Sequence, residues 1–159
     1  MQHEMRRKRQ ELPREEAERM LREATHGVLA LYDGECPYGV PLTHAYVDGR
    51  LVFHCAPEGH KLQAMRAYPM ASYTVVEQDL VIPEAYTTAY KSAIAFGRLR
   101  ELEGDEKVQA LRQLGHRFRP GFDDELEEEI APRLHRMVVF VLEVERLTGK
   151  LGKELLAQG

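Results

Sequence analysis

The stretch Phe53-His54-Cys55-Ala56-Pro57-Glu58-Gly59-His60-Lys61-Leu62 carries the most information about the fold of this 159-residue chain. It predicts the end of a strand, a turn through Pro57 and Gly59, and the start of a helix. The free N–H groups and the positive dipole end of a helix start suit a phosphate. Lys61 would add a positive charge, and His60 a hydrogen-bond donor. The alternative is an ordinary helix start whose Lys61 points into water.

Outward from this stretch, the chain alternates between strand and helix patterns. Tyr38 to Val47 and Leu51 to Cys55 are predicted strands, joined by the tight-turn dipeptide Asp48-Gly49. Further strands are predicted over 27–32, 71–76, 92–102 and 136–147, and helices from Pro13, over 60–68, around 108–118 and from Asp123. Because about six antiparallel strands can close a small barrel, these elements predict one α+β domain built on such a barrel.

Composition and charge narrow the class of protein. The chain is 43% hydrophobic and 30% charged, with a net charge of −4, which gives no basic surface for nucleic acid or anionic membranes. A single domain over 1–159 is expected, with residues 1–10 as a disordered tail. Cys36 and Cys55 lack the spacing of a disulfide framework, and we see neither a signal peptide nor a membrane-spanning run. A cytoplasmic protein is therefore expected.

Two more stretches could contribute to a binding site. Gly39 and Pro41, within Tyr38 to Tyr46, indicate either a distorted edge strand or a strand approached closely by a planar ligand. Tyr86 to Ser92 gathers hydroxyl groups and one lysine just before a strand, where they could hold a polar ring edge or simply begin a strand at the surface.

Taken in order, these stretches resemble a known family. The series Tyr38-Gly39-x-Pro41, Phe53-His54-x-Ala56-x-Glu58-Gly59-x-Lys61 and Thr87-Thr88-x-Tyr90-x-Ser92 is similar to the 5-nitroimidazole resistance branch of the pyridoxamine-phosphate-oxidase-like, FMN-binding superfamily. The likeness extends to Leu147-Thr148-Gly149-Lys150. It implies a six-stranded antiparallel split β-barrel with flanking helices, and a homodimer with FMN at the subunit interface.

The resemblance also implies which residues hold FMN. Pro41, Leu42 and Thr43 would line the isoalloxazine ring, and backbone groups of Phe53, His54, Cys55 and Ala56 would meet the polar edge of its pyrimidine. His60 and Lys61 would hold the phosphate. Tyr90 and Ser92 would complete the pocket, from the same subunit or from the partner.

His60 stands where many flavin split barrels have an arginine, and the nitroimidazole branch is associated with a functional histidine in this region. The resemblance therefore implies an FMN-dependent oxidoreductase that takes electrons from a reduced nicotinamide and reduces a nitroimidazole or another small nitro compound. His60 or His54 would donate a proton. The alternative from another class is a non-catalytic flavin- or haem-binding protein that stores, senses or sequesters its ligand.

Other chemistries have little support in the sequence. The seven histidines show no HxH or HExxH motif and no zinc-type spacing, so no metal site is expected. There is no GxSxG motif for a serine hydrolase. A pyridoxamine-phosphate oxidase proper is also disfavoured, because the chain is short and lacks an arginine-rich C-terminal segment.

Overall fold

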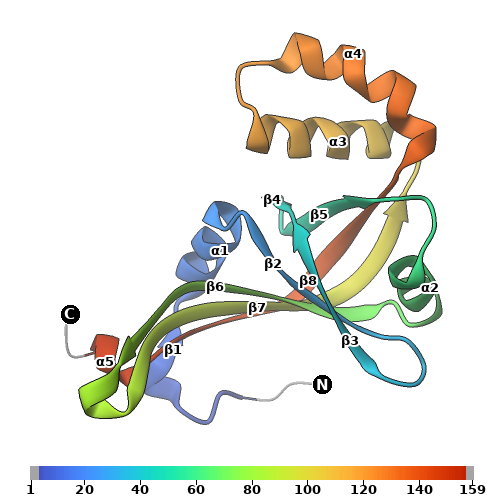
Figure 1. Cartoon of the computed structure of the whole chain (residues 1–159). Helices are drawn as coiled ribbons and strands as arrows, with labels where there is room; N and C mark the ends of the chain where they lie inside the picture. The colour runs from blue at the N-terminus through green and yellow to red at the C-terminus, as the bar shows by residue number, and fades with distance from the viewer. Residues whose placement is uncertain (1–3, 157–159) are drawn as a thin grey trace.

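The fold is α+β, in a computed structural model that describes residues 4–156 (Figure 1). Its helices are α1 (Arg14–Glu23), α2 (His60–Ala67), α3 (Gly104–Phe118), α4 (Asp123–Arg133) and α5 (Lys153–Leu156). Its strands are β1 (Glu11–Leu12), β2 (His26–Tyr32), β3 (Pro37–Thr43), β4 (Ala45–Val47), β5 (Arg50–Cys55), β6 (Met70–Ile82), β7 (Thr87–Leu102) and β8 (Val138–Leu151). Three short 3-10 helices cover Lys8–Gln10, Pro83–Ala85 and Leu134–Arg136.

The strands form one antiparallel sheet in the order β3-β2-β6-β7-β8-β5-β4, with β1 paired to β8. The two ends of this order, β3 and β4, are separated in the chain by His44 alone. The sheet therefore closes on itself through one bent segment. We expected that segment as a single strand, so the bent β3–β4 and the five strands β2, β5, β6, β7 and β8 make up the predicted six-stranded barrel.

Two apolar cores hold the molecule together. The first fills the barrel and includes Leu29, Phe53, Tyr73 and Phe140, with α1 and α2 packed against it. The second lies between β4, β5 and β8 and the α3–α4 pair, which covers the outside of these strands (Figure 1). Because β5 and β8 are covered on both sides, Leu51 to Phe53 and Val139 to Leu142 are buried without alternation.

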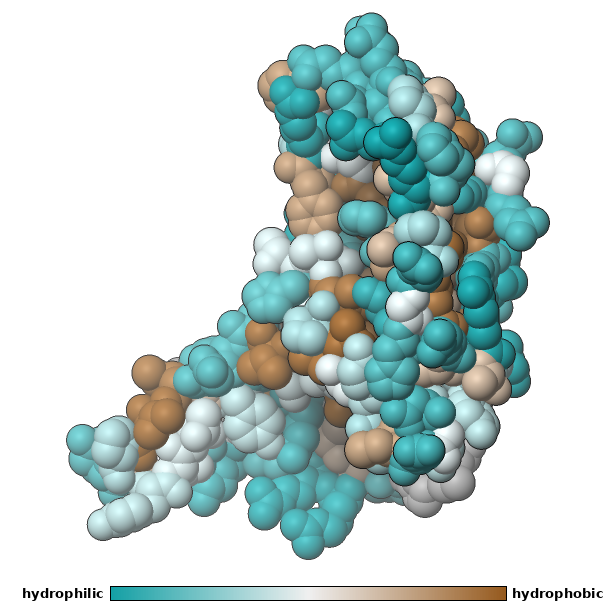
Figure 2. Space-filling view, turned by 45° about the vertical axis from the view of Figure 1, so that its right-hand side comes forward, coloured by the Kyte–Doolittle hydropathy of each residue, from teal (hydrophilic) through white to brown (hydrophobic). Residues whose placement is uncertain are grey.

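The β6–β7 hairpin is longer than its sequence predicts. We expected strands over 71–76 and 92–102, but both continue into a projecting arm, with an irregular register between Val76 and Gln78. The polar residues Glu77, Gln78 and Asp79 interrupt the apolar pattern of β6, so the sequence did not predict that backbone pairing continues beyond them. Leu80 and Val81 are about 60% exposed on the arm, and Figure 2 shows hydrophobic residues gathered near its end.

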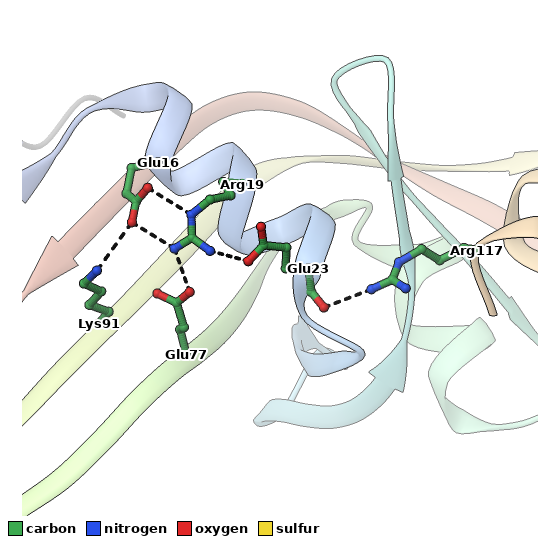
Figure 3. A network of polar contacts seen from close by, with 6 residues as sticks. All are labelled: Glu16, Arg19, Glu23, Glu77, Lys91 and Arg117. Atoms are coloured by element: carbon green, nitrogen blue, oxygen red, sulfur yellow. Dashed lines mark hydrogen bonds and ion pairs between the residues drawn. The ribbon is translucent and has the colours of Figure 1, made fainter.

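Helix α1 is tied to the base of this arm by charged groups (Figure 3). The Arg19 guanidinium binds Glu16 and Glu23 of the same helix and Glu77 of β6, at 2.6 Å for Glu77. The Glu16 carboxylate also faces the Lys91 ammonium of β7 at 3.5 Å. The helix begins as predicted, with Pro13 at its N-cap and Glu16 in its first turn.

The N-terminal region is more ordered than its composition suggests. Lys8–Gln10, which we expected within a disordered tail, form a 3-10 helix, and the Gln10 side chain is buried. Residues 1–3 of the expected tail lie outside the described residues.

Candidate functional site

The barrel is split between β3 and β5. One edge of β3 pairs with β2, and one edge of β5 pairs with β8. The other edge of β5 pairs with β4 only from Arg50 to Val52, so Phe53 to Cys55 have no strand partner on that side among the described residues. Backbone N–H and C=O groups on an unpaired edge are available to a ligand. Phe53 to Cys55 are among the residues whose backbone, by the resemblance, would meet the polar edge of the flavin.

A buried network joins the two sides of the split. The hydroxyl of Tyr73 lies 2.6 Å from the Leu42 carbonyl oxygen of β3 and 2.9 Å from His44 Nδ1. The ring of Tyr73 also packs edge-on against Phe53 of β5, with centroids 5.1 Å apart. His44 Nε2 lies 2.7 Å from the carbonyl oxygen of Leu21, near the end of α1. The positions of β3 and β5 around the split are thus set from inside the barrel.

The predicted ring-lining residues differ in exposure. Pro41 and Thr43 are exposed, whereas Leu42 is half-buried and packs against the core. The side chain of Phe53 is fully buried, which leaves its backbone for a ligand, as predicted. Ala56 follows β5 and is exposed. The exposed side chains among these residues are therefore those at alternate positions of β3 and the one that follows β5.

Burial and the positive charge of Lys61 both shift the pKa values of two residues at the end of β5. Burial lowers the pKa of His54, and the positive charge of Lys61 lowers it further. Burial raises the pKa of the Cys55 thiol, against the opposing effect of Lys61. Lys61 is half-buried in the first turn of α2. Cys55 packs against the barrel core, whereas the adjacent His54 is exposed on the opposite face of β5.

His60 is held by two residues of the β2–β3 region. Its Nε2 lies 3.1 Å from the Asp33 Oδ2 atom, and its ring stacks on Tyr38 with centroids 4.4 Å apart. The other Asp33 oxygen accepts the backbone N–H groups of Glu35 and Cys36 at 2.9 and 2.7 Å. These two hydrogen bonds, followed by His60, lower the pKa of Asp33. Asp33 is a site residue that the sequence did not reveal, because its partner lies 27 positions away.

The start of α2 fits an anionic group such as a phosphate. Gly59 precedes the helix with φ +133°, a backbone conformation that favours glycine, and an added Cβ there would contact no atom within 4 Å. The N–H groups of Leu62 and Gln63 donate to the Gly59 carbonyl oxygen, which leaves those of His60 and Lys61 for a ligand. Lys61 supplies a positive charge beside them, whereas Nε2 of His60 already faces Asp33. The donor set therefore fits a phosphate held by Lys61 and the backbone.

Tyr90 and Ser92 lie far from the split within one chain. Near them on β7, Lys91 pairs with Leu151, whereas Cys55 pairs with Val138 at the other end of β8. Thirteen residues of strand span about 40 Å. Figure 1 likewise shows the arm and α2 on opposite sides of the barrel. The structure does not bring these two residues to the other predicted site residues of the same subunit.

Two other features lie outside the predicted site. A hollow of about 1230 Å³ lies over the outer face of β2, β6, β7 and β8, where Tyr32, Met70 and Phe96 line it, and none of the predicted site residues does. Among the described residues, no group of three or more His, Cys, Asp and Glu side chains could hold a metal ion. No described helix is long and apolar enough to cross a membrane.

The closed antiparallel barrel, split between β3 and β5 beside a helix start, defines a class of small split-barrel proteins. The chain belongs to the pyridoxamine 5'-phosphate oxidase family, whose model matches residues 13–151. This confirms the family that the sequence motifs indicated. No curated protein matches the chain in sequence.

Three solved structures show how far this fold extends. A candidate 5-nitroimidazole antibiotic resistance protein from Bacteroides thetaiotaomicron is 22% identical, with a TM-score of 0.76, over 89% of this chain and 86% of its own. An FAD-binding protein from Mesorhizobium loti is 26% identical, with a TM-score of 0.63, over 90% and 97%. An FAD- and haem-binding protein from Mycobacterium smegmatis is 24% identical, with a TM-score of 0.80, over 95% and 80%.

Proposed function

We propose that this protein is an FMN-dependent oxidoreductase that transfers electrons from a reduced nicotinamide to a small nitro compound, such as a nitroimidazole. The observation that carries the proposal is the unpaired edge of β5 beside the start of α2, which offers backbone groups to a flavin ring and Lys61 to its phosphate. FMN is preferred to a dinucleotide because the helix start presents one lysine for one phosphate. The similar structures described as an FAD-binding protein and as a candidate 5-nitroimidazole antibiotic resistance protein support a flavin cofactor and a nitroimidazole acceptor.

The residues of the chain would bind and orient the cofactor and substrate. When bound, FMN supplies the redox chemistry, accepting two electrons and passing them on. Pro41 and Thr43 of β3 would hold the ring, and backbone groups of Phe53 to Ala56 would bind its polar edge. His54 and His60 are the candidate proton donors.

A second copy of the chain would complete the site. Val28 of β2 pairs with Thr74 of β6, so Val28, Tyr32, Met70 and Val76 share the outer face of the sheet, and each is more than 40% exposed. Apolar residues gathered on one face mark an interaction surface. Ser92 is on that face of β7 as well, because it alternates with Ile94, the residue paired with Thr74. A homodimer through this face would carry Tyr90 and Ser92 towards the partner's split.

The first experiment is the absorption spectrum of the protein after incubation with FMN and gel filtration. Bound flavin should give bands in the blue and near-ultraviolet, and the loaded protein should oxidise NADPH faster when a 5-nitroimidazole is added. Turnover no higher than that of free FMN would refute the enzymatic proposal.

The dimer is tested by analytical sedimentation, which should give a dimer for the wild type. Val76→Arg should give a monomer that binds FMN less tightly.

The second candidate function is non-catalytic binding of a flavin or haem. It is favoured by the fold shared with the Mycobacterium smegmatis protein that binds FAD and haem. A Soret band after addition of haem, without NADPH oxidation, would support it. Both functions fit a cytoplasmic protein, since Cys36 and Cys55 are free thiols.

A further inference from the structure

A carboxylate in the turn between β2 and β3 contacts the histidine that begins α2. The Asp33 Oδ2 atom lies 3.1 Å from His60 Nε2, although 27 residues separate them in the chain. Asp33 is 18% exposed, whereas His60 is 52% exposed. The pair therefore has a shielded acceptor and a histidine that solvent and small molecules can reach.

The turn fixes the orientation of Asp33 before His60 is considered. Its Oδ1 accepts two backbone N–H groups, from Glu35 and Cys36, which leaves Oδ2 directed to the imidazole. These bonds favour the ionised carboxylate and lower the pKa of Asp33. An ionised carboxylate only accepts hydrogen bonds, so the His60 nitrogen that faces it carries a proton.

The His60 ring is also fixed on one side. Tyr38 stacks on it with an angle of 27° between the planes. With Nε2 bound to Asp33, Nδ1 is the remaining polar atom, and it has no hydrogen-bond partner among the described residues. Among the described residues, the charged or titratable groups in contact with the ring are Asp33 from the turn and Tyr38 from β3, and Lys61 is the next residue of α2.

We infer that Asp33 is a positioning residue that fixes His60 with its proton on Nε2, so that Nδ1 is the nitrogen that transfers a proton to the substrate. The inference rests on the proposed function and specifies which ring nitrogen of one candidate proton donor, His60, faces the substrate. It also assigns different roles to His60 and Lys61, which the resemblance implied would hold the phosphate together. Lys61 is left to hold the phosphate, because the carboxylate beside His60 would repel one.

The proton transfer balances for a nitro group. A reduced nicotinamide supplies the equivalent of a hydride, which is two electrons and one proton, by way of the flavin. The imidazolium of His60 supplies the second proton from Nδ1: this N–H bond breaks as an O–H bond forms on a nitro oxygen. The nitro compound becomes a nitroso compound, water leaves, and His60 regains its proton from solvent.

The first test is the tautomer of His60, measured by ¹⁵N NMR on the flavin-free protein near pH 8. The wild type should carry the ring proton on Nε2. In Asp33→Asn, the backbone N–H groups of Glu35 and Cys36 should still donate to the amide oxygen. The NH₂ group then faces His60 Nε2, which has to accept a hydrogen bond, so the ring proton should move to Nδ1. Glu35→Gln removes a charge from the same turn and should leave the tautomer unchanged. An Nδ1–H tautomer in the wild type, or no change in Asp33→Asn, would overturn the inference.

The second test uses FMN-loaded protein with NADPH and a 5-nitroimidazole. Asp33→Asn should lower kcat by about 10- to 100-fold, which is the effect of losing a carboxylate that orients a metal-bound histidine. The Kd for FMN should stay within about twofold. If the wild type turns over and Asp33→Asn matches it, the positioning role is wrong while the proposed function stands. If the wild type gives no turnover, the proposed function fails, and the proton-transfer role fails with it whatever the tautomer.

Discussion

Burial of His44 should make the stability of the fold depend on pH. Its side chain is fully buried, with Nε2 2.7 Å from the Leu21 carbonyl oxygen and Nδ1 2.9 Å from the Tyr73 hydroxyl. Burial lowers the pKa of His44 from its usual 6.5 to about 4. At neutral pH the ring is therefore uncharged, and its Nε2–H donates to Leu21.

The size and direction of the effect follow from this shift. Because the folded pKa is below the unfolded one, the unfolded chain takes up the proton first as pH falls below 6.5. The stabilisation is complete above the unfolded pKa and is lost as pH falls towards 4. From these two values, protonation of His44 should lower the free energy of unfolding by about 2 kcal/mol between pH 7 and pH 5, and by about 3 kcal/mol between pH 7 and pH 4.

The assay is urea unfolding of the wild type and of His44→Gln at several pH values. Glutamine can still donate to the Leu21 carbonyl but does not titrate in this range. The variant should be less stable at pH 7, by about 1–3 kcal/mol, because the contact with Tyr73 is disrupted. The difference should shrink or reverse by pH 5. Other groups also titrate, such as the carboxylate of Glu16, because its hydrogen-bonded ion pair with Arg19 lowers its pKa to about 2. Their contribution is the same in the wild type and the variant, so it cancels in the difference between the two curves. Parallel stability curves from pH 7 to pH 5 would refute the argument.

Three further changes test other parts of the structure. Lys61→Ala should weaken FMN binding by about 1.5–3 kcal/mol in a fluorescence titration, through loss of a charge-assisted contact, and an unchanged Kd would remove this residue from the site. Gly97→Ala should lower the free energy of unfolding by about 3 kcal/mol or more, because the added Cβ would lie 1.8 Å from the Glu143 carbonyl oxygen; a wild-type denaturation midpoint would contradict that clash. Arg19→Ala should cost about 1 kcal/mol in low salt and less in 1 M NaCl, since its network is made of partly exposed ion pairs; a salt-independent loss would point to packing instead.

The barrel could be predicted from the sequence because its signals are local. The Asp48-Gly49 turn, the helical stripe of Ala17, Met20 and Leu21, and the apolar run from Val138 to Leu142 each depend on neighbouring residues. The run lies in the strand predicted over 136–147, and its Phe140 and Leu142 side chains lie in the barrel core. Local pattern and tertiary packing agree there, so the prediction was confirmed.

The polar part of the site could not be predicted in the same way. Asp33 was read only as the end of a strand, and Tyr73 and His44 as strand residues, because their partners lie between 23 and 31 positions away in the chain. Backbone hydrogen bonds that orient a carboxylate leave no mark in residue type or period. The roles of Tyr90 and Ser92 depend on a second copy of the chain and stay predictions.

The position of β8 in the chain governs when the barrel can form. It pairs with β1, β5 and β7, and its partner β5 precedes it by about 80 residues. Ribosomes synthesise chains from the N-terminus at about 5–20 residues per second. The apolar faces of β5 and β7 therefore stay uncovered for several seconds, until β8 has been synthesised. Such distant pairing also places folding in the slow, millisecond-to-second range. During synthesis these uncovered strands would be open to chaperones and to misassociation with other nascent chains.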